Sequence, residues 1–227
     1  MKQLKCKSFA KLNLCLHVLG KRDDGFHNIQ SIFQPINFYD TLTFTTNDTG
    51  IIEVETDQFM IERNLINKAY ELISKKYNLS HGLHVRLKKN IPLSSGLGGG
   101  SSNAAVTLLA MNKLFELSMS KEELLSHAST LGSDVPFFML GKSAIVTGRG
   151  EVVEGIVLEK KHYVLILSKY RVSTGEIFES FPESDFSQKL DKPDLLASKY
   201  NSLEDVVMNK YPELLQTKYW LSSFGKV

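Results

Sequence analysis

The chain has 227 residues, 42% of them hydrophobic and 23% charged, which is ordinary for a globular protein and argues against a disordered chain. Its net charge of +2 gives no reason to expect nucleic acid as a partner. Two cysteines are too few for a disulfide scaffold, and no apolar run approaches the roughly eighteen residues of a membrane span, so we expect a cytoplasmic protein without a membrane partner.

The first half of the chain reads as strands with one helix between them. Apolar and polar residues alternate in the predicted strands, as expected where one face of a sheet is buried. The turn-forming sequence from Asn47 to Gly50 lies between two of these strands and predicts a β-hairpin with a long loop. Asn64 is a suitable N-cap for a helix that ends at Tyr77. The predicted strands cover residues 12–18, 38–46, 51–56 and 84–91.

Two further helices are predicted in the middle of the chain. The first follows a run of glycines, and Ser101 or Ser102 is a suitable N-cap for it. The second opens with Ser120 and Glu123, which have the spacing of a capping box, and it should end at Gly132.

The last third of the chain restarts the alternation of strands and helices. Pro212 is well placed in the first turn of a helical tail. Short strands are predicted over residues 143–148, 152–158 and 163–168. We therefore expect a mixed α/β chain with two domains, residues 1–155 and 156–227.

The run from Ile91 to Ala105 is the most informative part of the sequence. Glycine loses more backbone freedom on folding than any other residue, so a dense glycine cluster is costly. This cluster leads at once into a helical pattern, and a glycine loop at a helix N-terminus offers unpaired N–H groups and a favourable dipole to phosphate. The spacing therefore predicts an anion-binding loop. Its glycines are Gly96, Gly98, Gly99 and Gly100.

Spacing alone does not assign this loop to a general phosphate-binding motif. No Lys follows the glycines, which excludes a Walker A motif. Gly96 and Gly98 match the start of a dinucleotide fingerprint, but Ser101 replaces its third glycine. The acidic residue at the expected distance, Glu116, falls in a helical segment rather than at the end of a strand. No His-Arg-Asp or Asp-Phe-Gly follows, which excludes a protein kinase loop.

Lys11 is a candidate for phosphate chemistry. A period of two places it on the same strand face as Asn13, Cys15 and His17, opposite the leucines. A lysine at the rim of a strand is usually solvated. If it faces a phosphate site instead, it supplies a fixed positive charge for a transferring phosphoryl group.

Asp134 lies directly after a predicted helix end and before an apolar run. A carboxylate in that position is often only a turn or cap residue. Phosphoryl transfer also needs a base that orients the attacking hydroxyl, and Asp is suitable for that task. Both interpretations remain open at this point.

A turn at Asp24-Gly25 precedes an aromatic pair, Phe26 and His27. One interpretation is a core Phe beside a surface His. The other is a stacking surface for a flat ligand group, with the imidazole as a hydrogen-bonding partner.

The segment from Pro92 to Ala105 resembles the central motif of the GHMP small-molecule kinases. Four other blocks agree with that superfamily in order and spacing, and the resemblance spans essentially the whole chain. These blocks are Ala10-Lys11-Leu12-Asn13-Leu14, Arg22-x-Asp24-Gly25-Phe26-His27, Leu131-Gly132-Ser133-Asp134-Val135-Pro136-Phe137-Phe138 and Gly148-Arg149-Gly150-Glu151, and Val172-Ser173-Thr174 with Phe178 also matches.

The resemblance implies an α+β fold with two domains. The N-terminal domain, residues 1–155, would resemble the second domain of ribosomal protein S5 and bind ATP. The C-terminal domain, residues 156–227, would be an incomplete ferredoxin-like α/β sandwich, because members of the superfamily continue for several tens of residues with a third Gly-rich segment. We expect ATP and the active site to lie between the domains, in a monomer or homodimer.

The resemblance also implies a catalytic pair. Asp134 would orient and deprotonate the acceptor hydroxyl, and Lys11 would steady the γ-phosphate and favour the ionised carboxylate. Mg²⁺ would bridge phosphate oxygens, with Ser102 as its protein ligand. The residues that would wrap the ATP phosphates are Pro92, Leu93, Ser94, Ser95, Gly96, Leu97, Gly98, Gly99, Gly100, Ser101 and Ser102.

The triple glycine before Ser-Ser-Asn-Ala-Ala is similar to one branch of the superfamily, which uses ATP to phosphorylate the 2-hydroxyl of a cytidyl diphosphate-linked sugar alcohol in isoprenoid precursor synthesis. For that substrate the resemblance implies stacking of the cytosine between Phe26 and Phe178, with His27 at its polar edge and Asn13 nearby. Phe26 stands where the branch often has Tyr, so stacking is kept and a hydroxyl contact is lost. The alternatives are another GHMP small-molecule kinase and a catalytically impaired nucleotide-binding homologue.

Overall fold

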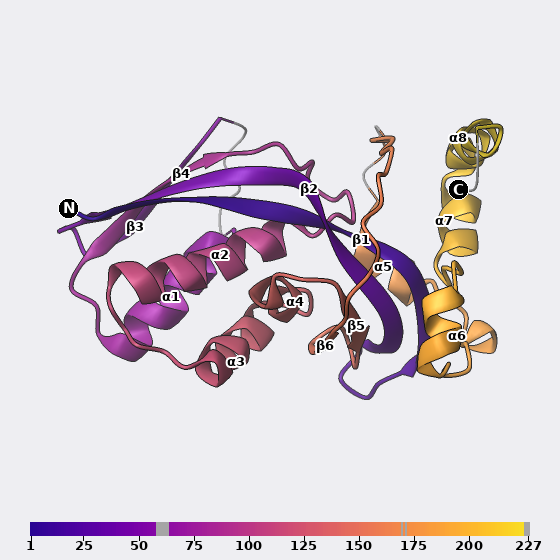
Figure 1. Ribbon diagram of the computed structural model, residues 1–227, viewed down its shortest axis with the longest axis horizontal. Coiled ribbons are helices and arrows are strands. Elements are labelled where there is room, and N and C mark those ends of the chain that lie inside the picture. The colour runs from indigo at the N-terminus through magenta and orange to yellow at the C-terminus, as the bar shows by residue number, and fades with distance from the viewer. Residues whose placement is uncertain (58–63, 169, 171, 225–227) are drawn as a thin grey trace.

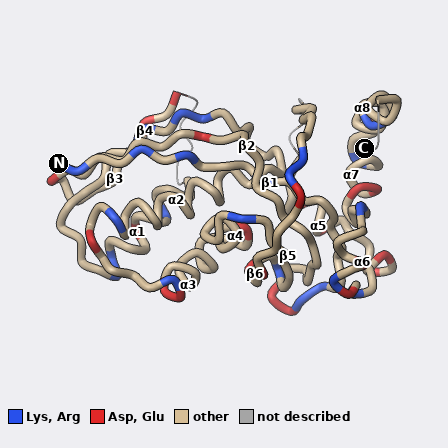
Figure 2. Tube along the Cα trace, in the orientation of Figure 1, with Lys and Arg blue, Asp and Glu red and all other residues tan. Residues whose placement is uncertain are grey.

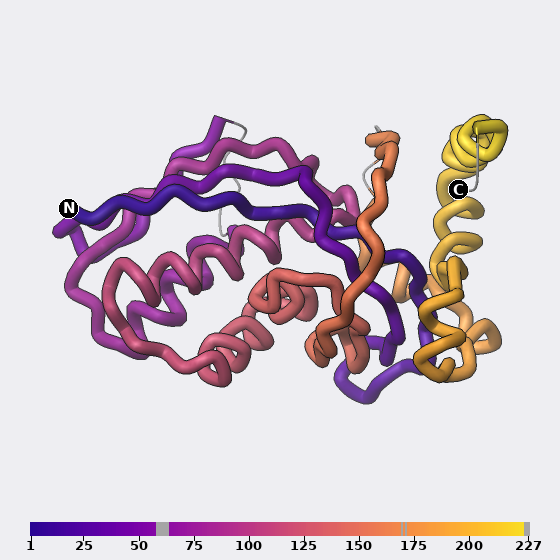
Figure 3. The backbone as a smooth tube through the Cα atoms, in the orientation of Figure 1, coloured from indigo at the N-terminus to yellow at the C-terminus, as the bar shows by residue number. Residues whose placement is uncertain are grey.

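The computed structural model describes residues 1–57, 64–168, 170 and 172–224 (Figure 1). Two very long strands, β1 (Gln3–Lys21) and β2 (His27–Asn47), pair along their whole length and run through the molecule. The N-terminus lies at one end of the long axis and the C-terminal helices lie at the other (Figure 3). Basic and acidic residues are both scattered along the trace (Figure 2).

Within the described residues the strands form one six-stranded sheet in the order β3-β4-β2-β5-β6, with β1 on the other side of β2. Only the pairing of β3 with β4 is parallel among these strands. Because β2 is so long, its residues 41–47 pair with β4 and its residues 31–33 pair with β5. The shorter strands are β3 (Ile52–Thr56), β4 (Gly82–Lys88), β5 (Ala144–Thr147) and β6 (Val152–Gly155).

The helices fall into two groups along the chain. They are α1 (Leu65–Tyr77), α2 (Gly99–Leu114), α3 (Lys121–Leu131) and α4 (Val135–Leu140), then α5 (Thr174–Glu179), α6 (Lys192–Ala197), α7 (Glu204–Lys210) and α8 (Pro212–Ser222), with a 3₁₀ turn over Glu183–Asp185. None of these described helices is both long and apolar enough to cross a bilayer.

The main core lies between the sheet and helices α1, α2 and α3 (Figure 1). Phe44 of β2 and Leu83 of β4 are fully buried there, together with Leu108 of α2. In β1 the side chains alternate, so that Cys6 packs against this core while Lys5 and Lys7 are exposed. One face of the sheet is therefore covered by helices and the other is open.

A second cluster closes the far end of the two long strands. Val18 and Ile29 pack there against Ile177 of α5 and Leu203, which precedes α7. The backbone of Leu16 also exchanges hydrogen bonds with the C-terminal part, donating to Tyr200 O and accepting from Ser202 N. The strands β1 and β2 thus contact both groups of helices, and the boundary at residue 155 stays a prediction.

The predicted β-hairpin around Asn47 to Gly50 is wrong. β4 lies between β2 and β3, antiparallel to the first and parallel to the second. Alternating polar and apolar residues identify a strand with one buried face, but they do not identify the strand that pairs with it. Here the pairing strand is β4, which follows β3 and α1 in the sequence. Gly82, the first residue of β4, lies so close to the Ile51 carbonyl that a Cβ could not be added there.

The helix signals of the middle segment are mostly confirmed. Asn64 caps α1 by accepting from Asn67 N at 3.0 Å, and the capping box of Ser120 and Glu123 is present at α3. The predicted cap of α2 is wrong, since α2 begins within the glycines and Gly98 is its N-cap.

The strands predicted over 143–148 and 152–158 are present as β5 and the shorter β6, and Pro212 opens α8 as expected. The strand predicted over 163–168 is absent, because that segment has no ladder partner within the described residues and carries no regular structure. The segment is rich in residues that favour strands, but β-propensity without a paired neighbour does not make a strand.

Candidate active site

The glycine loop connects the end of β4 to the start of α2. Gly98 adopts the left-handed conformation, with φ +71°, and is the N-cap of α2 without a side-chain capping bond. The first backbone N–H groups of a helix have no partner within the helix. No capping side chain competes for them here, so the loop and the helix N-terminus together can bind an anion.

The space around Gly98 is too small for any other residue. A Cβ added there would lie 2.8 Å from Cζ of Phe138 and 3.2 Å from Cγ of Lys11. The glycine therefore lets the loop approach both α4 and the strand that carries Lys11.

We expect Gly98→Ala to lower the free energy of unfolding by about 1–3 kcal/mol through the left-handed backbone, with a further cost from the contact with Phe138. Denaturant unfolding measures the loss. Gly141→Ala is the matched control, because Gly141 has φ +67° and open space around its Cα. Equal losses in the two variants would contradict the close approach at Gly98.

Lys11 is buried beside this loop, with its side chain 6% exposed. Its Nζ donates to Asn13 Oδ1 at 2.7 Å, lies 3.5 Å from Asp134 Oδ2 and sits 4.3 Å from the centre of the Phe33 ring. Its backbone N–H donates to Leu97 O at 2.9 Å, which fastens the glycine loop to β1. Lys11 is therefore not a solvated strand end.

Asp134 precedes the first residue of α4, but its side chain makes no capping hydrogen bond. Its carboxylate remains 30% exposed while facing the Lys11 ammonium. A carboxylate that is held by one cation and reached by solvent can accept a proton from a bound hydroxyl. The structure thus brings Lys11, Asp134 and the glycine loop together.

The shared strand face predicted for Lys11, Asn13, Cys15 and His17 holds only in part. A bulge between Asn13 and Cys15 breaks the alternation of β1. Asn13 stays beside Lys11, whereas Cys15 is buried among apolar side chains and the Nε2 atom of His17 lies 2.9 Å from Ser198 Oγ. Only Lys11 and Asn13 belong to the candidate site.

Ser102 lies in the first turn of α2 and is 1% exposed. Its Oγ accepts a hydrogen bond from Ser8 Oγ at 2.8 Å, a partner that the sequence analysis missed although the inward period of β1 places Ser8 on the helix side. Next to it, Asn103 Oδ1 is buried and has no hydrogen-bond partner among the described residues.

No group of three or more His, Cys, Asp or Glu side chains that could hold a metal occurs within the described ranges. Mg²⁺ in kinases keeps several waters and takes only one or two protein ligands besides substrate phosphates. The Ser102 hydroxyl, in the first turn of α2 beside the loop, is an oxygen donor that suits an ion held mainly by phosphate, so this residue fits the expected ion.

The aromatic residues of the predicted substrate site make different ring contacts. The ring of His27, the first residue of β2, lies 5.4 Å from the ring of Phe178 in α5, centre to centre. Phe26 is half exposed and lies instead under the guanidinium of Arg149, 4.9 Å from its Cζ. The structure therefore brings His27 and Phe178 together, and Phe26 contacts Arg149.

Burial lowers the pKa of His27 below the ordinary 6.5, and the charge of Lys21 lowers it further against a weaker opposing effect of Glu183. The unfolded chain then binds a proton before the folded chain does as the pH falls. We expect the contribution of His27 to the free energy of unfolding to decrease below about pH 6.5 and to level off below the folded pKa.

Denaturant titrations between about pH 8 and pH 5 measure this slope. His27→Gln should make it shallower without abolishing it, because burial also lowers the pKa of His17 and His127. An unchanged slope in the variant would contradict the assignment.

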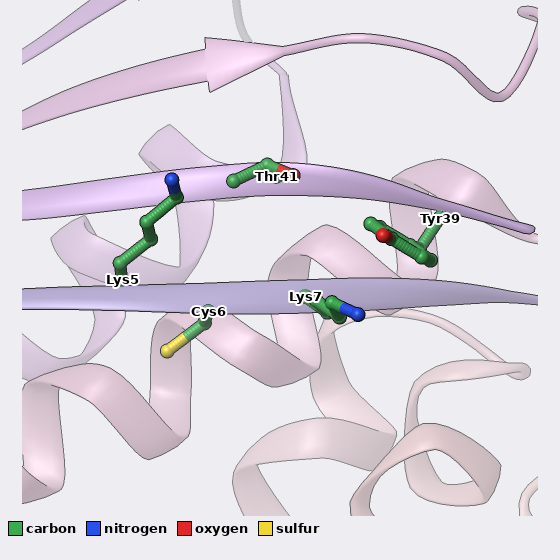
Figure 4. A pocket seen from close by; sticks show the side chains of 5 residues that line it. All are labelled: Lys5, Cys6, Lys7, Tyr39 and Thr41. Atoms are coloured by element: carbon green, nitrogen blue, oxygen red, sulfur yellow. The ribbon is translucent and has the colours of Figure 1, made fainter. Parts of the chain in front are cut away.

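A shallow cavity of about 320 Å³ lies elsewhere, on the open face of the sheet (Figure 4). Lys5, Cys6 and Lys7 of β1 and Tyr39 and Thr41 of β2 line it, and the Lys7 ammonium sits 4.3 Å from the centre of the Tyr39 ring. None of the predicted site residues lines this cavity, so it is separate from the candidate site.

Comparison with known proteins gives a consistent assignment. Residues 64–142 match the model of the GHMP kinases N terminal domain. The chain is 38% identical over 229 aligned positions to the 4-diphosphocytidyl-2-C-methyl-D-erythritol kinase of Burkholderia lata, covering 95% of this chain and 78% of that protein. It is 41% identical over 213 positions to the protein of the same name from Prochlorococcus marinus, covering 92% of this chain and 68% of that protein.

Solved structures agree. A crystal structure of 4-(cytidine 5'-diphospho)-2C-methyl-D-erythritol kinase matches with a TM-score of 0.79 and 29% identity, over 97% of this chain and 83% of that one. The homoserine kinase of Cytophaga hutchinsonii, at 16% identity and a TM-score of 0.54, shares the fold over 87% of this chain and 64% of its own. The predicted α+β fold of the GHMP kinases is confirmed. The chain therefore belongs to the GHMP kinases, a superfamily of ATP-dependent small-molecule kinases, and within it to the 4-diphosphocytidyl-2-C-methyl-D-erythritol kinase family.

Proposed function

We propose that this chain transfers the γ-phosphoryl group of ATP to the 2-hydroxyl of 4-diphosphocytidyl-2-C-methyl-D-erythritol, giving the 2-phosphate and ADP. The observation that carries the proposal is the Lys11–Asp134 pair, with 3.5 Å between Nζ and Oδ2, beside a glycine loop that opens a helix. The relatives of 37–41% identity that bear the name of this kinase support the choice of substrate.

Asp134 acts on the acceptor. Its carboxylate accepts the proton of the 2-hydroxyl and orients the oxygen for attack, while the Lys11 ammonium attracts the charge that develops on the transferring group. Asn13 accepts a hydrogen bond from the same ammonium, which fixes the direction of the Lys11 side chain. Phosphoryl transfer depends mainly on such positioning and charge stabilisation.

The ATP phosphates bind along the glycine loop, residues 92–102, where backbone N–H groups and the N-terminus of α2 favour negative charge. Mg²⁺, when bound with ATP, neutralises phosphate charge, and Ser102 is its proposed protein ligand. The short contact between the loop and β1, through Leu97 O and the Lys11 N–H, keeps the catalytic ammonium near this site.

His27 and Phe178 form the base-binding part of the site in this proposal. Because burial lowers the pKa of His27, its imidazole is neutral near pH 7 and offers one donor and one acceptor to the polar edge of cytosine. Phe178 supplies an apolar ring beside it. Phe26, on the Arg149 side, completes the stacking surface when the substrate is bound.

A substrate panel tests the proposal. The purified chain, with ATP and Mg²⁺, is offered the cytidyl diphospho-methylerythritol and, separately, homoserine, mevalonate and galactose, and ADP release is measured. Turnover of the first substrate alone supports the proposal. Preference for another alcohol indicates a different GHMP kinase, and ATP binding by calorimetry without any product indicates a nucleotide-binding homologue that lacks catalysis.

A further inference from the structure

A buried ion pair lies beneath the glycine loop and takes no part in the mechanism above. Asp40 of β2 is fully buried, and the side chain of Lys89, the residue after β4, is 6% exposed. The Lys89 Nζ lies 2.7 Å from Asp40 Oδ2. Burying two charges is costly, and such a pair rarely adds stability over apolar residues of the same size. Stability alone therefore does not explain why this ion pair is buried.

Asp40 holds the chain where it enters the loop. Its Oδ1 atom accepts hydrogen bonds from the backbone N–H groups of Asn90 and Ile91, each at 2.8 Å. These two residues connect β4 to Pro92, the first residue of the predicted phosphate-binding segment. The carboxylate thus fixes the direction in which the loop leaves the sheet.

Lys89 joins the two ends of the loop. Its Nζ donates to Ile91 O at 2.5 Å, at the loop entrance. The same atom would lie 3.0 Å from a Cβ added to Gly99, the first residue of α2. That Cβ would also lie 2.9 Å from Cγ2 of Ile91. Ile91, before the loop, and Gly99, after it, therefore both lie close to the Lys89 ammonium.

The charges are arranged to suit an anion in the loop. The Lys89 ammonium lies close to Gly99 in the first turn of α2, at the end of the helix where the dipole favours an anion. Asp40 of β2, 2.7 Å from the ammonium, compensates this charge and fixes the position of the ammonium. An apolar pair in the same place would leave the Ile91 carbonyl without this donor.

We propose that Asp40 and Lys89 are positioning residues of the glycine loop, which set its affinity for the phosphates of ATP without touching the acceptor alcohol. This inference rests on the proposed function, since it concerns the same loop. It assigns a role to two residues that the sequence pattern does not single out, because Lys88 and Lys89 read as the solvated end of a strand.

Two variants test it. Asp40→Asn alone would remove the negative charge 2.7 Å from a buried ammonium, so the test changes both residues. The double variant Asp40→Asn/Lys89→Met removes both charges and keeps an acceptor for the N–H groups of Asn90 and Ile91. A surface ion pair gives the matched control, Glu154→Gln/Lys192→Met, because those side chains lie 2.7 Å apart, are exposed and belong to β6 and α6 rather than to the loop.

The double variant should stay folded, with a lower unfolding temperature because the Ile91 carbonyl loses its donor, and should bind ATP about tenfold more weakly, the size of one charge-assisted hydrogen bond. KM for ATP should rise in parallel, with KM for the alcohol unchanged, and the control should match the wild type. Wild-type affinity for ATP in a folded double variant would overturn the inference and leave the proposed function intact. A wild-type chain that binds no ATP would overturn both.

Discussion

Asp134→Asn is expected to lower kcat by about 10²–10⁴-fold, the usual contribution of a general base. The amide keeps the size and planar shape of the carboxylate, so the change removes its charge and its ability to accept a proton. ATP affinity should change little, because the proposed contacts with the ATP phosphates come from N–H groups of the loop and of α2 rather than from this carboxylate. Steady-state kinetics and calorimetry with ATP measure the two effects separately.

Asp48→Asn is the control for this prediction, since the Asp48 side chain is 91% exposed and lies outside the site. A fall in kcat confined to Asp134→Asn supports a role in proton transfer. Full activity of Asp134→Asn would sink the proposed mechanism, whatever its ATP affinity.

Lys11→Met should reduce kcat by about 10²–10³-fold, the cost of removing one electrostatic contact to a developing charge. Methionine fills the space of the buried stem without its ammonium, so the contacts with Asn13 Oδ1 and Asp134 Oδ2 are lost while the chain keeps its volume. The backbone bond from residue 11 to Leu97 O does not depend on the side chain, and the glycine loop should stay in place.

Lys7→Met on the same strand provides the comparison. Lys7 is exposed on the open face of the sheet, where its ammonium contacts only the Tyr39 ring among the described interactions. The two variants make the same chemical change four positions apart along β1. Equal kcat values for them would show that the charge of Lys11 does not act in the transition state.

Local signals predicted local structure well. The caps at Asn64 and Ser120 need only a side chain and backbone groups three residues away, so a short stretch of sequence determines them. The glycine loop was recognised from its motif, and the structure places it at the helix N-terminus that the motif requires. The roles of Lys11 and Asp134 stay predictions, although the fold brings the two side chains together.

Long-range partners could not be read from the sequence. The hairpin prediction failed because β4, far along the chain, inserts between β2 and β3. Likewise, nothing near Lys89 indicates that Asp40, on another strand, neutralises it. A lysine at a strand end is normally solvated, and only the packed structure shows the exception. The cytoplasmic location, the Mg²⁺ ligand and the oligomeric state also stay predictions.

The hydrogen bond from the Lys11 amide to Leu97 O makes one backbone proton a reporter of the loop. That proton can exchange with solvent deuterium only when the loop lifts from β1, because the bond must break first. Its exchange rate therefore measures how often the loop opens in the absence of nucleotide. If ATP keeps the loop closed, this single amide should exchange more slowly as ATP is added, which gives a readout of occupancy that needs no turnover.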